Sequence, residues 1–155
     1  MSLQDIYNFL PISDALGTAG QPTAEQFPHI RAAGYEVVVN LAMPDSPNAL
    51  PDEAERVAAQ GMAYYHIPVV WESPTDHDLV QFFETLKACQ GKKVFVHCVA
   101  NMRVSAFVFL YRVLHQSVPI EKATQALLKL WQPDEIWQAF IDRTLAQHGH
   151  PPEAP

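Results

Sequence analysis

Residues 94–105 read VFVHCVANMRVS, and this stretch predicts a buried strand, a short loop and the start of a helix. Val94–His97 is short, follows Gly91 and consists mainly of β-branched and aromatic residues, which is typical of a buried strand. The helix expected over 104–114 (VSAFVFLYRVL) is apolar on almost every side. Such a helix is usually central and covered by other helices. The stretch therefore predicts a strand–loop–helix unit at the centre of the fold.

Segments on both sides of this unit extend the pattern. Residues 37–41 and 63–70 have the composition of buried strands, and a weaker strand is expected near 9–13. Helical patterns cover 23–34, 51–60 and 75–90, and two more helices follow Pro119. Strands that alternate with helices, followed by a helical C-terminal third, predict an α/β fold. We expect a central, mostly parallel sheet of about four to five strands flanked by helices.

Two helix starts carry recognisable caps, and one helix contains an unfavourable residue. Thr23 and Gln26 form a possible capping box, and Thr75 is the expected N-cap of the 75–90 helix. Pro28 is awkward inside the first of these helices because proline lacks the N–H that a helix interior needs. In the 75–90 helix, Cys89 falls on the apolar face, so we interpret it as a core residue.

The length and composition indicate one globular domain. A chain of 155 residues with 48% apolar residues is expected to form a single domain over 1–147, followed by a tail over 148–155. It has 10 Lys and Arg against 17 Asp and Glu, a formal net charge of −7. This charge argues against a nucleic-acid partner or an anionic membrane surface.

The sequence shows neither the pattern of a targeting signal nor that of a metal site. The N-terminal residues MSLQDIYNFL have no basic region before a long apolar core, so no signal peptide is expected. No apolar run approaches about 18 residues, so no membrane span is expected either. Two free thiols fit a reducing, cytoplasmic location. The histidines and carboxylates show no metal-ligand spacing, and no glycine loop for a nucleotide is present.

Cys98 lies just beyond the carboxyl end of a predicted parallel strand, where ligands bind in open α/β sheets. N–H groups at a helix start attract anions and help a thiol to lose its proton. Arg103 offers a fixed fork of donors for a phosphate, while His97 and Ser105 could support the loop or the thiolate. A lone cysteine at a strand end is usually a small buried apolar residue. The combination of these four residues favours an anion site with a nucleophile.

The nine residues HCVANMRVS (97–105) resemble the signature loop of the cysteine-dependent protein tyrosine and dual-specificity phosphatases. That loop reads His-Cys, five residues, Arg, then Ser or Thr. GTAGQPTAEQF (17–27), GYEVVVNLAMPDS (34–46) and YHIPVVWESPTDHDLVQFF (65–83) resemble successive segments of bacterial members. The resemblance implies a parallel sheet flanked by helices and a cysteinyl-phosphate intermediate, without a metal or other cofactor. It also implies a phosphorylated protein or small molecule as substrate.

The resemblance assigns the phosphate-binding loop to Val99, Ala100, Asn101, Met102, Arg103 and Val104, with Cys98 as nucleophile. The arginine departs from the pattern, because Arg103 is five positions after Cys98 instead of six. In one interpretation the loop is one residue shorter, as in the six-residue active loop of rhodanese-type sulfurtransferases. In the other, its length is unchanged and only the arginine has moved.

The second interpretation rests on two residues. Ser105 keeps the family's position seven after Cys98, and Asn101 replaces a glycine where the backbone is left-handed, which asparagine tolerates. Val104 would then occupy the arginine's usual place. Because one helical step is about 100°, Arg103 would not point into the loop in the usual way. Reduced activity, an unusual substrate or a pure binding role would follow.

A general acid must protonate the leaving oxygen of a phosphate ester. The resemblance places it on the loop WESPTDHD (71–78), where Glu72 and Asp76 are the main candidates and Asp78 a further one. Asp76 and Asp78 have a simpler role as favourable charges in the first turn of a helix. Asp45, in the earlier loop AMPDS (42–46), is a more distant candidate.

Four functions remain open from the residues. A cysteine-dependent phosphatase is favoured by the 97–105 loop. A rhodanese-type sulfurtransferase is favoured by the short spacing between Cys98 and Arg103. A degenerate phosphate-binding module is favoured by the displaced arginine and the uncertain acid. The fourth is a structural domain with an inert thiol. Trp131, Trp137 and Phe140 are expected mainly to pack the last two helices, although they could line a specificity surface.

Overall fold

Five strands form one sheet in the order β1-β2-β5-β3-β4 in the computed structural model, which describes residues 2–149. The strands are β1 (Leu10–Ser13), β2 (Leu16–Ala19), β3 (Val37–Asn40), β4 (Ala63–His66) and β5 (Val94–His97). β1 is antiparallel to β2, and the other neighbours are parallel. The expected mostly parallel sheet is thus confirmed, with β5, the strand of the opening stretch, at its centre.

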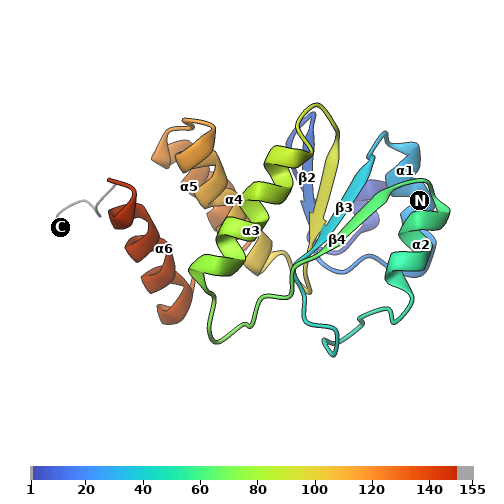
Figure 1. The fold of residues 1–155 in the computed structure, drawn as a ribbon, viewed down its shortest axis with the longest axis horizontal. Coiled ribbons are helices and arrows are strands. Elements are labelled where there is room, and N and C mark those ends of the chain that lie inside the picture. Colours follow the sequence, from blue (N-terminus) through green and yellow to red (C-terminus); the bar gives the residue numbers. More distant parts are fainter. Residues whose placement is uncertain (1, 150–155) are drawn as a thin grey trace.

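Helices cover both faces of this sheet (Figure 1). The short 3₁₀ helices η1 (Leu3–Asp5) and η2 (Ala24–Gln26) and the helices α1 (Phe27–Ala32) and α2 (Glu53–Ala59) come from the N-terminal half. Helices α3 (Asp76–Ala88), α4 (Met102–His115), α5 (Ile120–Leu128) and α6 (Glu135–Gln147) follow. Figure 1 shows α1 and α2 on one side of the sheet and α3 to α6 on the other.

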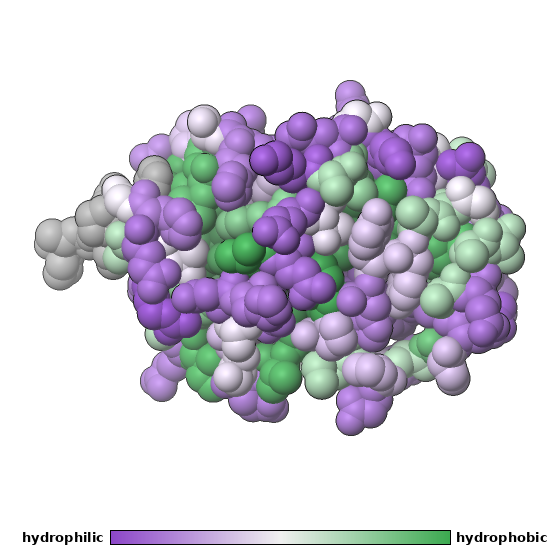
Figure 2. Space-filling view, viewed as in Figure 1, coloured by the Kyte–Doolittle hydropathy of each residue, from purple (hydrophilic) through white to green (hydrophobic). Residues whose placement is uncertain are grey.

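The sheet divides the core in two, and the side chains of β5 alternate between the two halves. Val94 and Val96 belong to the apolar cluster that includes α4 and α6, whereas Phe95 belongs to the cluster that includes α1 and α2. Successive side chains of a strand point to opposite faces, so a strand covered on both faces is apolar throughout. Polar residues cover much of the outer surface in the same view (Figure 2).

Several element boundaries differ from the sequence-based expectations. β2 was not expected, because the residues LGTA include glycine and alanine, which are depleted in strands. The expected strand 63–70 ends at His66. The Val69 N–H still donates to the Leu41 carbonyl at 3.0 Å, but Pro68 has no N–H to continue the ladder. Residues 67–75 instead form the loop that leads to α3.

The predicted caps are present, and they explain the helix starts. The Thr23 N–H donates to the Gln26 side chain at 2.8 Å and closes the capping box of η2. Pro28 lies in the first turn of α1, where the missing N–H costs little, so the expected 23–34 helix begins later. The Thr75 hydroxyl accepts from the N–H of Asp78 at 3.1 Å and caps α3.

Cys89 and the last helices follow the expected pattern. Cys89 is 3% exposed in the α3–α4 side of the core, which confirms its interpretation as a core residue. The expected tail begins at residue 148, and residues 150–155 of it lie outside the described part of the chain. Within 2–149, no helix has both the length and the apolar character that a membrane crossing requires.

Candidate functional site

The carboxyl ends of β3, β4 and β5 and the loops that follow them enclose a cleft of about 560 Å³. Its lining residues come from three loops, within 43–47, 70–72 and 98–103. In Figure 1 these loops gather at one edge of the sheet. Cys98 lies at the base of the cleft and is 1% exposed. Among residues 2–149 no group of three or more His, Cys, Asp or Glu side chains is suited to hold a metal ion.

The carbonyl groups of the loop after Cys98 are turned outward by neighbouring elements. The Val99 carbonyl accepts from the N–H of Gln21 at 3.0 Å, and the Ala100 carbonyl accepts from the side-chain amide of Asn8 at 3.0 Å. In a trans peptide the C=O and the next N–H point in opposite directions. The N–H of Ala100, which follows the Val99 carbonyl, therefore points away from Gln21 to the other side of the loop.

Asn101 ends the loop and starts α4. Its φ of 65° is left-handed, a conformation that asparagine adopts more readily than most residues. The expectation for this position is thus confirmed. The side-chain amide of Asn101 donates to the Asn8 carbonyl at 2.9 Å and to the Thr18 hydroxyl at 3.0 Å. Asn101 is fully buried, so its side chain anchors the loop and does not line the cleft.

The start of α4 leaves free N–H groups beside Cys98. The first bond of the helix runs from the N–H of Ser105 to the Asn101 carbonyl at 3.0 Å. The N–H groups of Val99, Ala100, Met102, Arg103 and Val104 have no hydrogen-bond acceptor within the described chain. Unpaired N–H groups at a helix start and the helix dipole together favour an anion. The loop therefore has the geometry of an anion-binding site.

Arg103 faces this site. It is 6% exposed, lines the cleft with Cys98 and donates from Nη1 to the Val69 carbonyl at 2.8 Å. Its buried Nε has no partner in residues 2–149. Val104, the next residue, is completely buried in the core and does not line the cleft. Of these two residues, the arginine is therefore the one that reaches the anion site.

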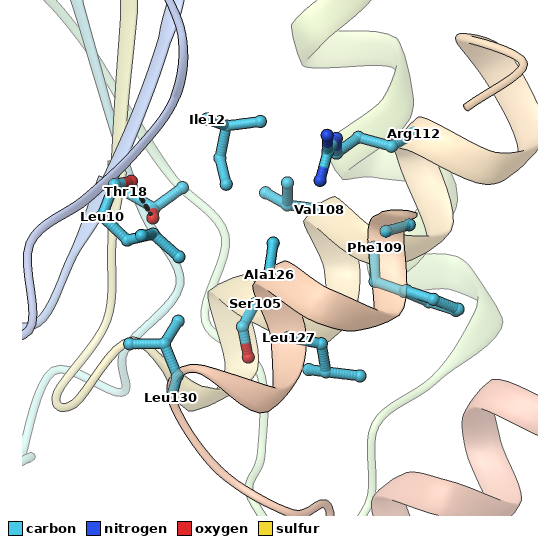
Figure 3. A pocket seen from close by; sticks show the side chains of 11 residues that line it. Leu10, Ile12, Thr18, Ser105, Val108, Phe109, Arg112, Ala126, Leu127 and Leu130 are labelled. Carbon is cyan, nitrogen blue, oxygen red and sulfur yellow. Dashed lines mark hydrogen bonds between the residues drawn. The ribbon is translucent and has the colours of Figure 1, made fainter. Parts of the chain in front are cut away.

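The expected role of Ser105 beside the thiolate is not supported. Its hydroxyl donates to the Met102 carbonyl at 2.6 Å and accepts from the indole N–H of Trp131 at 2.9 Å. Ser105 lines a different and very small cavity between α4, α5 and the first two strands (Figure 3). Of the two residues that favoured a loop of unchanged length, Ser105 thus faces away from Cys98, whereas Asn101 has the expected left-handed backbone. The direction of Arg103 agrees better with a loop shortened by one residue.

The tryptophans pack the helices and also support the wall of the cleft. Trp137 is completely buried, and its indole N–H donates to the Trp71 carbonyl at 2.9 Å. The Trp71 ring lies 5.3 Å from the Trp131 ring and 5.7 Å from the Trp137 ring, between centroids. The guanidinium carbon of Arg103 lies 5.8 Å from the Trp71 ring centroid. The packing expected of Trp131 and Trp137 therefore also holds Trp71 against Arg103.

The structure distinguishes the candidate acids by whether they line the cleft. Glu72 and Asp45 both line the cleft and are exposed at its rim. Asp76 is the exposed first residue of α3 and does not line the cleft, and neither does Asp78. Acidic residues in a first helical turn interact favourably with the helix dipole, which accounts for both of them. Of these candidates, Glu72 and Asp45 are therefore the carboxylates that line the same cleft as Cys98.

Sequence reasoning missed Glu53, which contacts His97, the residue before Cys98. Its Oε2 is 2.7 Å from Nε2 of His97, and the two side chains are 3% and 0% exposed. Burial by itself raises the pKa of the Glu53 carboxyl, but His97, with hydrogen bonds from Gln21 and Tyr64, lowers it below its usual value. The signal in the sequence is the spacing of Glu53 and Val57: residues four apart on a helix share a face, so Glu53 is buried on the same side as Val57.

Fold and site together define a domain of the tyrosine-phosphatase and dual-specificity-phosphatase class. A putative phosphatase of the DUF442 family from Shewanella putrefaciens is 35% identical, with a TM-score of 0.86. The match covers 96% of this chain and 97% of that one. TpbA of Pseudomonas aeruginosa, solved in complex with phosphotyrosine, shares the fold at 17% identity, with a TM-score of 0.64. That match covers 77% of this chain and 71% of TpbA.

Residues 11–141 match the family described as DSP-PTPase phosphatase fused to NAD+ kinase, and the chain belongs to this family. The expected family and the phosphatase class of hydrolases are thus confirmed. The beta-lactamase hydrolase-like protein of Xylella fastidiosa is 33% identical over 107 residues. This match covers 66% of the chain and 24% of that protein, so the chain spans about a quarter of this relative's length.

Proposed function

We propose that this protein is a phosphatase that hydrolyses a phosphomonoester through a cysteinyl-phosphate on Cys98. The proposal rests on one observation, which is that Cys98, Arg103 and the unpaired N–H groups of the loop share one cleft. These donors are suited to the equatorial oxygens of a phosphoryl group, whose charge they would stabilise during transfer. The guanidinium group of Arg103 would bind the phosphoryl oxygens, and its hydrogen bond to the Val69 carbonyl fixes its orientation.

The first step transfers the phosphoryl group to sulfur. The thiolate of Cys98 attacks phosphorus, an S–P bond forms, and the bond from phosphorus to the leaving oxygen breaks. The leaving oxygen takes a proton from a carboxylic acid at the rim, for which we propose Glu72 because it adjoins Trp71 at the cleft wall. Asp45 on the facing loop is the alternative.

The second step releases inorganic phosphate. The carboxylate formed in the first step takes a proton from a water molecule, and the water oxygen attacks phosphorus. The S–P bond breaks and Cys98 leaves as a thiolate. The loop donors hold the phosphoryl oxygens throughout, so the same site serves both steps without a metal or a cofactor.

Phosphotyrosine or a related aryl phosphate is the substrate class that we propose. The cleft has apolar walls at Met43, Pro47, Val70 and Trp71, which suit an aromatic leaving group. TpbA, which has the same fold, binds phosphotyrosine in its structure. A phosphorylated protein segment or a small aryl phosphate satisfies these features equally.

A phosphate-binding module with little turnover is the second candidate. It is favoured by Glu72 and Asp45, which are exposed and have no side-chain hydrogen bond to another described residue. An acid that is not held in place protonates a leaving group poorly. This candidate keeps the phosphate site and Arg103 but predicts binding without hydrolysis. The rhodanese-type alternative retains only the short spacing between Cys98 and Arg103, and family membership disfavours it.

Trapping the intermediate tests the proposed function. The protein mixed with an aryl phosphate and quenched in acid is expected to carry phosphate on the peptide that contains Cys98, detected by mass spectrometry. The initial release of the phenol is expected to show a burst, because a covalent intermediate splits the reaction into two steps. Cys89→Ala is the matched control, since Cys89 is buried in the core and should leave both signals unchanged. Binding of the aryl phosphate without phosphopeptide or phenol release would favour the binding module.

Replacing Glu72 tests the acid. Glu72→Gln is expected to lower kcat by about 10²-fold for an alkyl phosphate, because a poor leaving group needs the proton. For an aryl phosphate with an acidic phenol the loss should be much smaller. Asp45→Asn is measured in parallel, and the larger leaving-group dependence identifies the acid. Asp76→Asn is the control outside the cleft, and a loss there equal to that of Glu72→Gln would contradict the assignment.

A further inference from the structure

We propose that Glu53 is a positioning residue that keeps both ring nitrogens of His97 protonated and thereby promotes the thiolate of Cys98. The inference rests on the proposed function, because it concerns the nucleophile of that reaction. Glu53 lies on α2, outside the cleft that Cys98 lines. It would therefore act on the reaction only through His97.

The contacts of His97 require two donors. Nε2 lies 2.7 Å from the Glu53 carboxylate, and Nδ1 lies 3.3 Å from the Cys98 carbonyl oxygen. A carbonyl oxygen accepts hydrogen bonds but cannot donate them, so Nδ1 must carry a proton. An ionised carboxylate is likewise only an acceptor, so Nε2 must carry a proton as well. With Glu53 ionised, His97 is an imidazolium.

The surroundings of Glu53 favour its ionised form. The side-chain amide of Gln21 donates to Oε1 of Glu53 at 2.7 Å. The Tyr64 hydroxyl accepts from the Asn40 amide at 3.1 Å, which leaves its own proton for Glu53. Hydrogen bonds to a charged carboxylate stabilise that form. The carboxylate is thus surrounded by donors from three separate elements.

The pair acts on Cys98 in two ways. The imidazolium places a positive charge on the residue next to the thiol, and a nearby opposite charge favours the thiolate. Its Nδ1–H also holds the Cys98 carbonyl away from the cleft, which turns the following N–H toward it. Gln21 links the two effects, because its backbone N–H holds the Val99 carbonyl while its side chain holds Glu53.

The other ionisable groups around the thiol are few in the described chain. Glu53 on α2 faces His97, Tyr64 on β4 lies next to Glu53, and Arg103 on α4 lines the cleft with Cys98. Glu72 and Asp45 lie at the rim. Burial raises the pKa of Tyr64, so Tyr64 stays neutral at physiological pH. A change in thiol reactivity on replacing Glu53 therefore reports mainly on His97.

Nitrogen NMR of His97 gives the direct test. In the wild-type protein near pH 7.5, the ¹⁵N shifts of both His97 ring nitrogens are expected to show the imidazolium pattern. In Glu53→Gln they are expected to show a neutral ring. The rate of Cys98 alkylation by iodoacetamide near pH 6 should fall about tenfold or more.

Glu55→Gln is the matched control, because Glu55 is an exposed carboxylate on the same helix and should leave both readouts unchanged. A neutral His97 in the wild-type protein would overturn the inference without the need for any variant. Unchanged alkylation in a folded Glu53→Gln protein would overturn it too. Both readouts are independent of turnover, so an inactive protein that shows them would contradict only the proposed phosphatase.

Discussion

Cys98→Ser is expected to lower kcat for aryl phosphate hydrolysis by about 10⁴-fold or more, because loss of a covalent nucleophile removes the whole two-step path. A serine hydroxyl in the same loop is far less ionised than a thiol, so it cannot replace the thiolate. The loop N–H groups and Arg103 stay in place in this variant. Phosphate or vanadate binding, measured by calorimetry, should therefore persist while hydrolysis is lost.

Cys89→Ser is the appropriate comparison for this experiment. Cys89 is buried in the core at the end of α3 and does not line the Cys98 cleft. A serine there places a hydroxyl in apolar surroundings, so stability should fall while kcat of the folded protein is retained. Equal hydrolysis by wild type and Cys98→Ser would exclude the cysteinyl-phosphate. A common loss in both variants would point to unfolding as the cause.

Arg103→Lys is expected to lower kcat/KM by about 10²- to 10³-fold, which is typical for removal of one transition-state donor group. Lysine keeps the positive charge but lacks the planar guanidinium. In Arg103 that group donates from Nη1 to the Val69 carbonyl while Nε has no partner among the described residues and can bind an anion. It also loses the contact with the Trp71 ring. The measurement is steady-state kinetics on an aryl phosphate, with the dissociation constant of inorganic phosphate as a second readout.

Arg56→Lys controls for a general effect of removing a guanidinium. Arg56 forms an exposed ion pair with Asp52 at 3.0 Å on α2, and such pairs contribute little. The Arg56→Lys variant should therefore keep kcat/KM within about twofold of the wild-type value. Full activity of Arg103→Lys would show that charge alone suffices at this position. If Arg103→Ala were as active as the wild-type protein, Arg103 would not belong to the phosphate site. A loop shortened by one residue would then have no support from Arg103.

The local parts of the fold follow from the sequence. The residues VFVHCVANMRVS predict the central strand, the loop and the apolar helix, because strand periodicity, helix periodicity and backbone preference are properties of neighbouring residues. The caps at Thr23 and Thr75 and the left-handed backbone of Asn101 are likewise determined by residues close in the sequence. The position of Cys98 beyond a parallel strand follows from these elements, since ligands bind at that edge of such sheets.

The direction of each side chain around Cys98 depends on residues distant in the chain. Arg103 is oriented by the Val69 carbonyl, 34 positions away, and Ser105 by Trp131, 26 positions away. Glu53 reaches His97 across 44 positions. No periodicity encodes such pairs, because they form only when the packing of α2, α4 and the 67–75 loop brings the partners within hydrogen-bond distance. The tertiary structure therefore decided that Arg103 faces the cleft, that Ser105 does not, and that a buried carboxylate contacts His97.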